Sequence, residues 1–288
     1  MLVVLSTEHS KDSKHASYVF LAAYSDLPTG LLDYVMPYMH IFSEEAAISM
    51  KRPEEAEHCI DLKPDAQSLF MSIYNLSETE LAALREYLKN ALDKEWIQSF
   101  SSPADALILF VLKKDGGLHL CVDYQGLNQI IIKNQYSLPL ISELLNRLSK
   151  AKIFTKLNLR DAYHHILIAA KDCWKTAFRM RYEHFEYIVM SFGLANAPAT
   201  FQAYINNALS DLLDIYCIVY LNNILIFSNS KQEHKVHVTK VLECLECVNL
   251  FAKLSKCEFE VDKISFLRFV IDTNDVKMKS DRVSTIVE

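Results

Sequence analysis

The most informative stretch of the chain reads Tyr216-Cys-Ile-Val-Tyr-Leu-Asn-Asn-Ile-Leu-Ile-Phe227. Two apolar, β-branched runs flank Asn222 and Asn223, and such runs separated by two turn-forming residues predict a β-hairpin. Both arms are too apolar for a solvated ribbon, so we expect the hairpin to lie in a core with its tip at a cleft. The tip then offers two polar side chains that carry no charge.

The overall composition is that of a globular protein. Of 288 residues, 51% are hydrophobic and 23% charged, and only 5 glycines and 7 prolines are present, which argues against disorder and against repeats. The net charge of -6 indicates that any track for nucleic acid must be local. The 7 cysteines lack framework spacing and no secretory signal is visible, which predicts reduced thiols and an intracellular location, cytoplasmic or nuclear. No apolar run approaches the roughly 20 residues of a membrane-spanning helix.

The clearest helix in the sequence follows Ser77. Ser77 and Glu80 form a capping box, in which each side chain binds an unpaired backbone amide near the other residue. The apolar residues that follow at helical spacing are Leu81, Leu84, Leu88 and Leu92. We expect a helix to about Lys94, preceded by extended chain and by an irregular lead-in over residues 1–50.

Strands and helices then alternate without a regular βαβ pattern. The pattern predicts a hairpin from strands 107–112 and 118–124, and paired strands within 178–189. It further predicts strands over 153–159 and 264–271 and helices over 139–149, 197–213 and 231–248, with Leu140, Leu144, Leu145 and Leu148 facing inward. This mixture favours an α+β fold with antiparallel pairing.

Several motifs now occur together in a characteristic order. They are LFVLKKDGGLHLCVDYQGLN (109–128), FTKLNLRDAYHHI (154–166), FGLANAPATFQ (192–202), YLNN (220–223), LSKCEF (254–259) and FLRF (266–269). In this order and spacing the chain resembles the reverse transcriptase of gypsy-type LTR retrotransposon polyproteins, from about residue 41 to its end. The resemblance implies a right-hand polymerase fold with an antiparallel palm sheet and packing helices.

The resemblance also implies domain boundaries. The fingers and palm together would occupy residues 51–273. The fingers would be about 60–132 and 166–196, and the palm about 133–165 and 197–273. Residues 274–288 would begin a truncated thumb.

The family's chemistry implies a role for three positions. Nucleotidyl transfer uses two divalent cations, Mg²⁺ or Mn²⁺, which hard carboxylate ligands hold close together. The three metal-binding aspartates of the family correspond to Asn158, Asn222 and Asn223. Because amides bring no negative charge, we expect no metal to be retained productively and no polymerase activity. The family's partners, an RNA template and a DNA primer, would bind weakly or not at all.

Further positions match substrate-binding residues of the family. They are Lys113, Lys114, His119, Asp161, Tyr163, Gly193 and Gln202, with Leu267 and Arg268 at the primer grip. His119 stands where the family has an arginine that contacts the triphosphate, and neutral imidazole cannot give that bidentate grip. Arg268 replaces the glycine of the primer grip.

The departures from the family share one kind of mutation. Asp to Asn, Arg to His and Gly to Arg can each arise from a single G-to-A or C-to-T transition. Decay under no selection would produce such a set. Two alternatives to a decayed enzyme stay open: a non-catalytic module that binds RNA or an RNA–DNA hybrid, and a domesticated interaction protein.

Two other features invite a functional interpretation. His234 and His237, with Cys244 and Cys247, have zinc-like spacing, but one helix would separate the pairs by roughly 10 Å. A solvated helix face is therefore the better interpretation of these four residues. Lys253 and Lys256 both lie near the family's lysine that protonates pyrophosphate, and the sequence does not choose between them.

Overall fold

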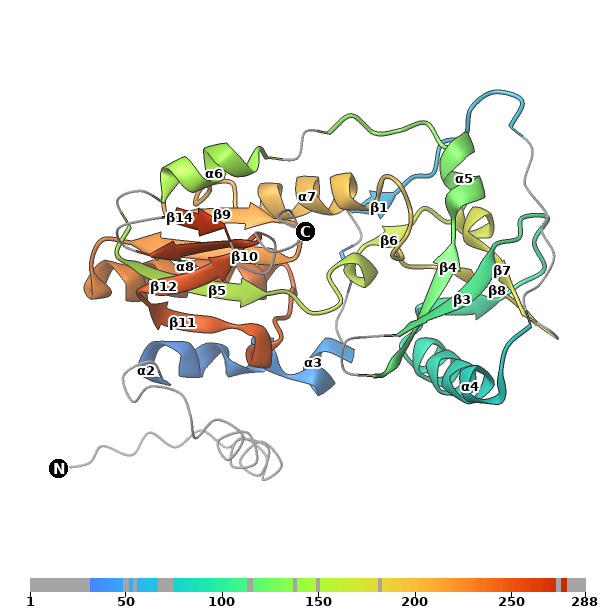
Figure 1. Cartoon of the computed structure of the whole chain (residues 1–288), viewed down its shortest axis with the longest axis horizontal. Coiled ribbons are helices and arrows are strands. Elements are labelled where there is room, and N and C mark those ends of the chain that lie inside the picture. The colour runs from blue at the N-terminus through green and yellow to red at the C-terminus, as the bar shows by residue number, and fades with distance from the viewer. Residues whose placement is uncertain are drawn as a thin grey trace, which may run out of the picture. The chain divides into compact units, whose positions relative to one another are not determined.

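The computed structural model describes residues 32–48, 52–53, 56–66, 75–112, 116–136, 139–148, 151–180, 183–272 and 276–278. The chain forms two compact units, Met1–Pro37 and Tyr38–Glu288 (Figure 1). Of the first unit only residues 32–37 are described, and they include helix α2 (Leu32–Val35). All further elements except the start of η1 belong to the second unit.

The expectation of an irregular segment through residue 50 is wrong for residues 32–48. After α2, a 3₁₀ helix η1 (Met36–Phe42) and a short helix α3 (Glu44–Ile48) follow. Tertiary contacts order this segment: the Ile41 carbonyl accepts the Ala252 N–H, and the Phe42 ring packs edge-on against Phe259. Such short pieces show no sustained period in a sequence. Residues 1–31 and 49–50 of the predicted lead-in lie outside the described residues.

A four-stranded antiparallel sheet contains the hairpin of residues 216–227. Its strand order is β11 (Glu258–Val261), β5 (Ile153–Asn158), β10 (Asn223–Ser228) and β9 (Cys217–Tyr220). The register places Asn223 opposite Asn158 on one side and opposite Tyr220 on the other. The strongly apolar β10 is therefore a central strand, paired along both edges.

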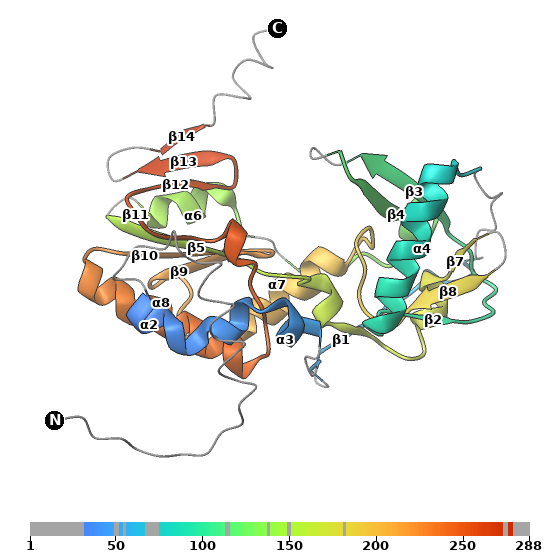
Figure 2. The ribbon, with the colours of Figure 1, turned by 90° about the horizontal axis from the view of Figure 1, so that it is seen from below.

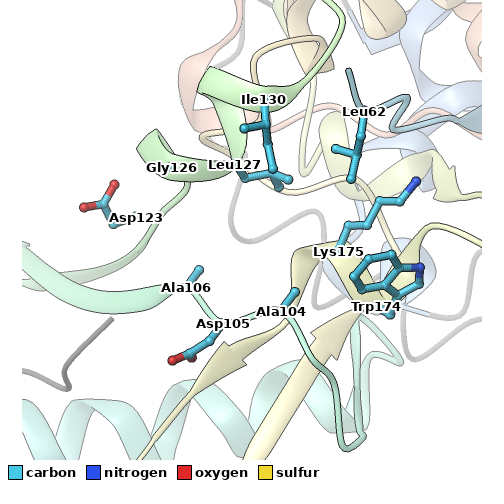
Figure 3. A pocket seen from close by; sticks show the side chains of 10 residues that line it. All are labelled: Leu62, Ala104, Asp105, Ala106, Asp123, Gly126, Leu127, Ile130, Trp174 and Lys175. Carbon is cyan, nitrogen blue, oxygen red and sulfur yellow. The ribbon is translucent and has the colours of Figure 1, made fainter. Parts of the chain in front are cut away.

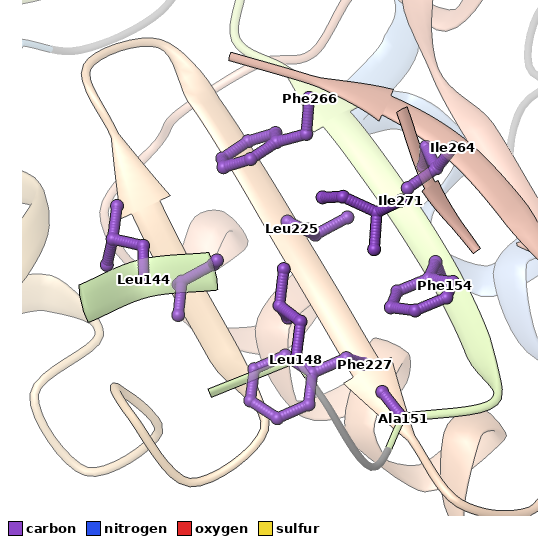
Figure 4. Packing of buried hydrophobic residues seen from close by; sticks show 10 residues of the cluster. Leu144, Leu148, Ala151, Phe154, Leu225, Phe227, Ile264, Phe266 and Ile271 are labelled. Carbon is purple, nitrogen blue, oxygen red and sulfur yellow. The ribbon is translucent and has the colours of Figure 1, made fainter. Parts of the chain in front are cut away.

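The two faces of this sheet are covered by different elements. Helix α8 (Lys231–Cys247) covers one face, and helix α6 (Ile141–Arg147) lies over the other (Figure 2). The core on the α6 side is one cluster of buried side chains (Figure 4) that includes Leu144, Leu148, Phe154, Leu225, Phe227, Ile264, Phe266 and Ile271. The prediction that Leu140 faces inward is wrong: it precedes α6 and is 62% exposed.

The predicted strand over 264–271 is also wrong, because it contains a turn. The residues form β12 (Lys263–Phe266) and β13 (Phe269–Asp272), and a third strand, β14 (Val276–Met278), pairs with β13. Phe266 pairs with Phe269, so Leu267 and Arg268 form a two-residue turn, with φ values of 48° and 73°. Neither leucine nor arginine favours positive φ, so the sequence gives no local signal for a turn at these positions.

The helix predicted after Ser77 is present. Helix α4 spans Glu78–Asp93, and both bonds of the capping box form: the Glu80 N–H donates to Ser77 Oγ, and the Ser77 N–H donates to the Glu80 carboxylate. The predicted hairpin is confirmed as β3 (Leu107–Leu112) and β4 (Leu118–Asp123). The paired strands are β7 (Phe178–Arg179) and β8 (His184–Tyr187), and β2 (Ile97–Ser99) extends that sheet.

The remaining elements are short. Strands β1 (Glu57–His58) and β6 (Leu167–Ile168) form a parallel pair. Helix α7 (Ala197–Ala208) ends before the predicted residue 213. The other helices are α5 (Gln125–Ile130) and the 3₁₀ helices η2 (Tyr163–His165), η3 (Cys173–Thr176) and η4 (Leu254–Lys256).

The prediction of a solvated face at His234 is wrong. His234 lies on α8 with no exposed surface, and its ring nitrogens are 2.8 Å from Thr155 Oγ1 and from Ser228 Oγ. His237 Nδ1 also bonds Ser228 Oγ at 2.7 Å, and its ring stacks on Tyr216. The two histidines therefore bind strands β5 and β10 to α8, which helical spacing alone does not reveal.

Candidate functional site

The turn between β9 and β10 differs by one residue from its predicted position. Leu221 and Asn222 form the turn, whereas Asn223 already belongs to β10, because the ladder with β5 includes it. The residue at positive φ is Leu221, at 52°. For a leucine the left-handed region costs about 1–2 kcal/mol, so surrounding contacts must hold this turn.

Gln202 supplies those contacts from helix α7. Its side-chain oxygen accepts the Leu221 N–H at 2.7 Å, and its amide nitrogen donates to the Val219 carbonyl at 3.3 Å and to Asn206 Oδ1 at 2.8 Å. Gln202 has no exposed surface. Its side chain holds the turn through these bonds, and a direct contact of Gln202 with substrate stays a prediction.

The structure brings the three asparagines together, as their family positions imply. Asn158 Nδ2 donates to Asn223 Oδ1 at 3.1 Å, and Asn223 Nδ2 donates to Asn222 Oδ1 at 3.0 Å. All three residues are half-buried. The result is a chain of neutral amides at the tip of the hairpin.

This donor set does not fit two divalent cations. Magnesium prefers anionic oxygens, and here two of the three side-chain oxygens already accept an amide N–H. Within the described part of the chain, no group of three or more His, Cys, Asp or Glu side chains is arranged to hold a metal ion. Two hydrogen bonds thus link the three amides directly to one another.

Two segments border the amide chain. The Lys253 N–H donates to the Asn158 carbonyl at 2.8 Å, which places the backbone of Lys253 against this strand. On the other side, the Leu159 N–H donates to the Asn222 carbonyl at 2.8 Å. The chain continues from Leu159 to Asp161, which is partly exposed and has a φ of 45°.

Tyr163 lies at the start of η2 and is nearly buried. Its ring packs edge-on against Phe192 and Phe201, at centroid distances of 4.8 and 5.7 Å. Burial, with a smaller effect of Tyr220, raises the pKa of its hydroxyl. Phe192 is 54% exposed and was not singled out from the sequence, because only the fold shows that it remains uncovered beside Tyr163.

The other predicted substrate positions are spread over the fingers and the loop before α7. His119 is exposed on β4, and Gly193 has a φ of 94°. The positive φ favours glycine, and a Cβ atom at Gly193 would lie only 3.3 Å from the Tyr124 ring. Lys113 and Lys114 lie outside the described residues.

The primer-grip positions Leu267 and Arg268 form the β12–β13 turn. Leu267 packs against the hydrophobic cluster beneath the hairpin. At a φ of 73°, Arg268 occupies a conformation in which glycine would not be strained.

A small cavity of about 40 Å³ lies in the fingers (Figure 3). It shares no residue with the asparagine tip. Asp105 lines it, but the carboxylate points away from Trp174 and Lys175 and lies 2.9 Å from Arg179. Burial raises the pKa of Asp105, against the opposing effect of Arg179. The cavity has room for a few water molecules.

Comparison with known proteins decides the family. The family model described as "Reverse transcriptase (RNA-dependent DNA polymerase)" matches residues 111–271, more than half of the chain. The chain belongs to the reverse transcriptase family. The Transposon Tf2-7 and Tf2-3 polyproteins of Schizosaccharomyces pombe are each 32% identical to this reverse transcriptase domain over 259 residues. Each match covers 90% of the chain and 19% of the polyprotein, so the chain spans about a fifth of these relatives.

Solved structures agree with this fold. The foamy viral protease-reverse transcriptase in complex with an RNA/DNA hybrid matches all of this reverse transcriptase domain, with a TM-score of 0.80 and 16% identity, over 39% of its own chain. A form of that protein in complex with double-stranded DNA matches with a TM-score of 0.81 and 16% identity, over 50% of its chain. The predicted α+β fold, with fingers and an antiparallel palm, is confirmed. Within the described residues, no helix is long and apolar enough to span a membrane.

Proposed function

We propose that this chain is the reverse transcriptase domain of a gypsy-type LTR retrotransposon polyprotein that has lost polymerase activity. The family reaction is RNA-directed DNA polymerisation, and the observation that carries the proposal is the chain of amides at the palm tip. Asn158, Asn223 and Asn222 hydrogen-bond to one another where the family has metal-binding aspartates.

The loss of charge is large enough to account for inactivity. At about 4 Å and a surface-like dielectric, one pair of unit charges interacts by roughly 4 kcal/mol, and a dication interacts more strongly. Three substituted carboxylates remove three such interactions from a site that must gather two dications. Asp161 keeps one carboxylate near the strand, and one carboxylate does not make a two-metal site.

Changes outside the tip support the same proposal. His119 offers a neutral ring in place of a permanently charged guanidinium. Arg268 places a side chain and backbone strain in the primer-grip turn, at a φ of 73°. Asp65, which also stands where the family has glycine, has a φ of 62°. These strained positions fit a chain in which glycine codons have decayed by transitions.

The domain boundaries, the partners and the location belong to the proposal as well. We assign fingers to about 60–132 and 166–196, palm to about 133–165 and 197–273, and the start of a thumb to 274–288. The family's partners are an RNA template and a DNA primer, and the foamy viral neighbour is in complex with an RNA/DNA hybrid. We propose that this chain binds such partners weakly or not at all. The protein is intracellular, and cytoplasm and nucleus are equally consistent with its reduced thiols.

Primer extension tests the proposal. An RNA template with an annealed DNA primer is incubated with the protein and deoxynucleotides, in Mg²⁺ and separately in Mn²⁺. We expect no extension above a control without protein. Template-dependent extension by the unchanged chain would overturn the assignment of inactivity.

A triple reversion measures how much else has been lost. The triple variant Asn158→Asp, Asn222→Asp, Asn223→Asp has carboxylates at all three positions but keeps His119 and Arg268. We expect extension to stay below a few per cent of that of an active family member. Full, processive synthesis by the triple variant would show that the amides alone account for the inactivity.

A further inference from the structure

Two thiols lie close together near the end of helix α8. Cys244 and Cys247 are three residues apart, and no other two of the 7 cysteines have this spacing. Cys247 is exposed and Cys244 is partly exposed, so small molecules in the solvent can reach the pair. Burial, and to a lesser extent the neighbouring Cys247 thiol, raises the pKa of Cys244. The proposed function uses neither residue.

The helical spacing comes close to the geometry of a disulfide. With a rise of about 1.5 Å per residue and a Cα radius of about 2.3 Å, residues three apart in a helix have Cα atoms about 5 Å apart. This separation lies within the range of about 4.4–6.8 Å that disulfides span. The Cβ atoms of such a pair are about 5–6 Å apart, whereas a disulfide needs about 3.5–4.5 Å. The turn must therefore tighten by about 1–2 Å.

The pair lies where a helix can tighten. Cys247 is the last residue of α8, and the Val248 N–H that follows donates to the Cys244 carbonyl at 3.2 Å. The next bond is already shorter in sequence, because the Asn249 N–H donates to the Glu246 carbonyl at 3.0 Å. Such 3₁₀-type bonds commonly tighten the last turn of a helix. Closing a disulfide here requires rearrangement of one terminal turn only.

We propose that Cys244 and Cys247 form a reversible redox pair that is oxidised by low-molecular-weight disulfides. First, the exposed Cys247 thiolate attacks one sulfur of the reagent, which releases one thiol and leaves the other half bonded to Cys247. The Cys244 thiol then loses its proton to water and attacks Cys247 Sγ, which releases the second half as a thiol. Two protein thiols are oxidised, and one reagent disulfide is reduced to two thiols.

The neighbouring residues connect this pair to η1. The Tyr38 hydroxyl donates to the Glu243 carboxylate at 3.1 Å, and Glu246 lies 2.9 Å from His40 Nε2. Both carboxylates belong to the same stretch of α8 as the two thiols. Tightening of this turn should therefore move the groups that hold η1, so oxidation changes a contact between two segments distant in sequence.

Mass spectrometry after thiol trapping tests the inference on the full chain. The reduced protein is incubated with oxidised glutathione at about pH 8, where part of an exposed thiol population is ionised. It is then alkylated and digested with trypsin. Cleavage after Lys240 and Lys253 gives a peptide, residues 241–253, that contains Cys244, Cys247 and no other cysteine. We expect this peptide to be recovered mainly with an internal disulfide and without glutathione.

A matched variant keeps both thiols and changes their spacing. Glu246→Cys, Cys247→Ser places an exposed thiol two residues from Cys244, and residues two apart do not face each other on a helix. We expect this variant to form about tenfold less internal disulfide than the unchanged chain. Cys244→Ser should stop at a glutathione adduct on Cys247. Cys59→Ser removes an exposed cysteine elsewhere and should behave as the unchanged chain.

Several outcomes would overturn the inference. They are a persistent glutathione adduct on Cys247 of the unchanged chain, equal closure in the spacing variant, and a disulfide between Cys244 and the buried Cys217, which would join two tryptic peptides. A disulfide that excess reduced glutathione does not reopen would contradict its reversibility. Circular dichroism checks the fold of each variant, and if the spacing variant unfolds, the fate of the adduct in the unchanged chain still decides.

Discussion

Two hairpins of the palm each contain a strained turn, and different contacts stabilise the two turns. Both have two-residue turns, and both place a leucine at positive φ: Leu221 at 52° and Leu267 at 48°. In β9–β10 the buried Gln202 accepts the turn amide, and β10 is paired on both sides. In β12–β13 the turn also contains the strained Arg268, and its leucine packs against the core.

The two turns should differ in how strongly substitutions affect their stability. Specific hydrogen bonds hold the first turn, which contains Asn222 and leads directly into Asn223. Nonspecific burial holds the second. We therefore expect the first hairpin to be sensitive to single polar substitutions, and the second to improve when its strain is removed.

The largest expected effect comes from the core beneath both hairpins. Phe154 lies on β5 with no exposed surface, in the cluster that also includes Leu225 and Phe266. Phe154→Ala should lower the free energy of unfolding by about 3–5 kcal/mol, because it leaves a cavity. Urea denaturation measures this. Leu140→Ala, at an exposed position before α6, is the control and should change stability by less than about 0.5 kcal/mol.

Acid should act on the first hairpin through His234, which bonds to β5 and β10. Burial, and to a lesser extent His237, lowers the pKa of His234 to about 4, below its ordinary value of 6.5. Between these values the unfolded chain binds a proton that the folded chain excludes. The contribution of His234 to the free energy of unfolding is therefore fully present above pH 6.5. It falls by about 3 kcal/mol as the pH is lowered to 4.

The variant that isolates this contribution is His234→Gln, whose side chain does not titrate. Other buried histidines, His58, His164 and His165, also have lowered pKa values and titrate over the same range. Denaturation curves at several pH values should therefore show a shallower loss of stability in the variant, and not its disappearance. An unchanged pH dependence would contradict the assignment to His234.

The first turn can be broken directly at Gln202. Gln202→Ala leaves the Leu221 N–H without its partner and removes the bond to the Val219 carbonyl. We expect a loss of about 2 kcal/mol, the cost of an unpaired buried polar group added to a strained turn. Asn206→Ala removes the bond between the Gln202 amide and Asn206 but keeps the bond to Leu221, and it serves as the control. Equal stability of Gln202→Ala and the unchanged chain would show that the turn holds without α7.

The smallest effect is a gain at the second turn. Arg268→Gly removes the side chain that disfavours a φ of 73° and should raise the free energy of unfolding by about 1 kcal/mol. The gain appears as a higher midpoint of urea denaturation with an unchanged m-value. Lys277→Gly, in the described strand β14, should not stabilise, because glycine weakens a strand interior. A loss of stability in Arg268→Gly would show that the arginine makes contacts worth more than its strain.

The sequence alone determined the main elements and singled out the asparagines as candidate site positions. Helix α4, the β3–β4 hairpin and strand β5 follow from capping residues and apolar periodicity, which are local signals. The sequence also predicts that Asn158, Asn222 and Asn223 replace metal-binding aspartates of the family, because the surrounding motifs fix the register.

Only the tertiary structure decided how those positions behave. The turn at Leu221 and the buried state of His234 depend on partners far along the chain: Gln202 for the former, Thr155 and Ser228 for the latter. The turn at Leu267 and Arg268 lies within an apolar pattern that continues on both sides. Local preference opposes each of these arrangements, and contacts between distant segments outweigh it.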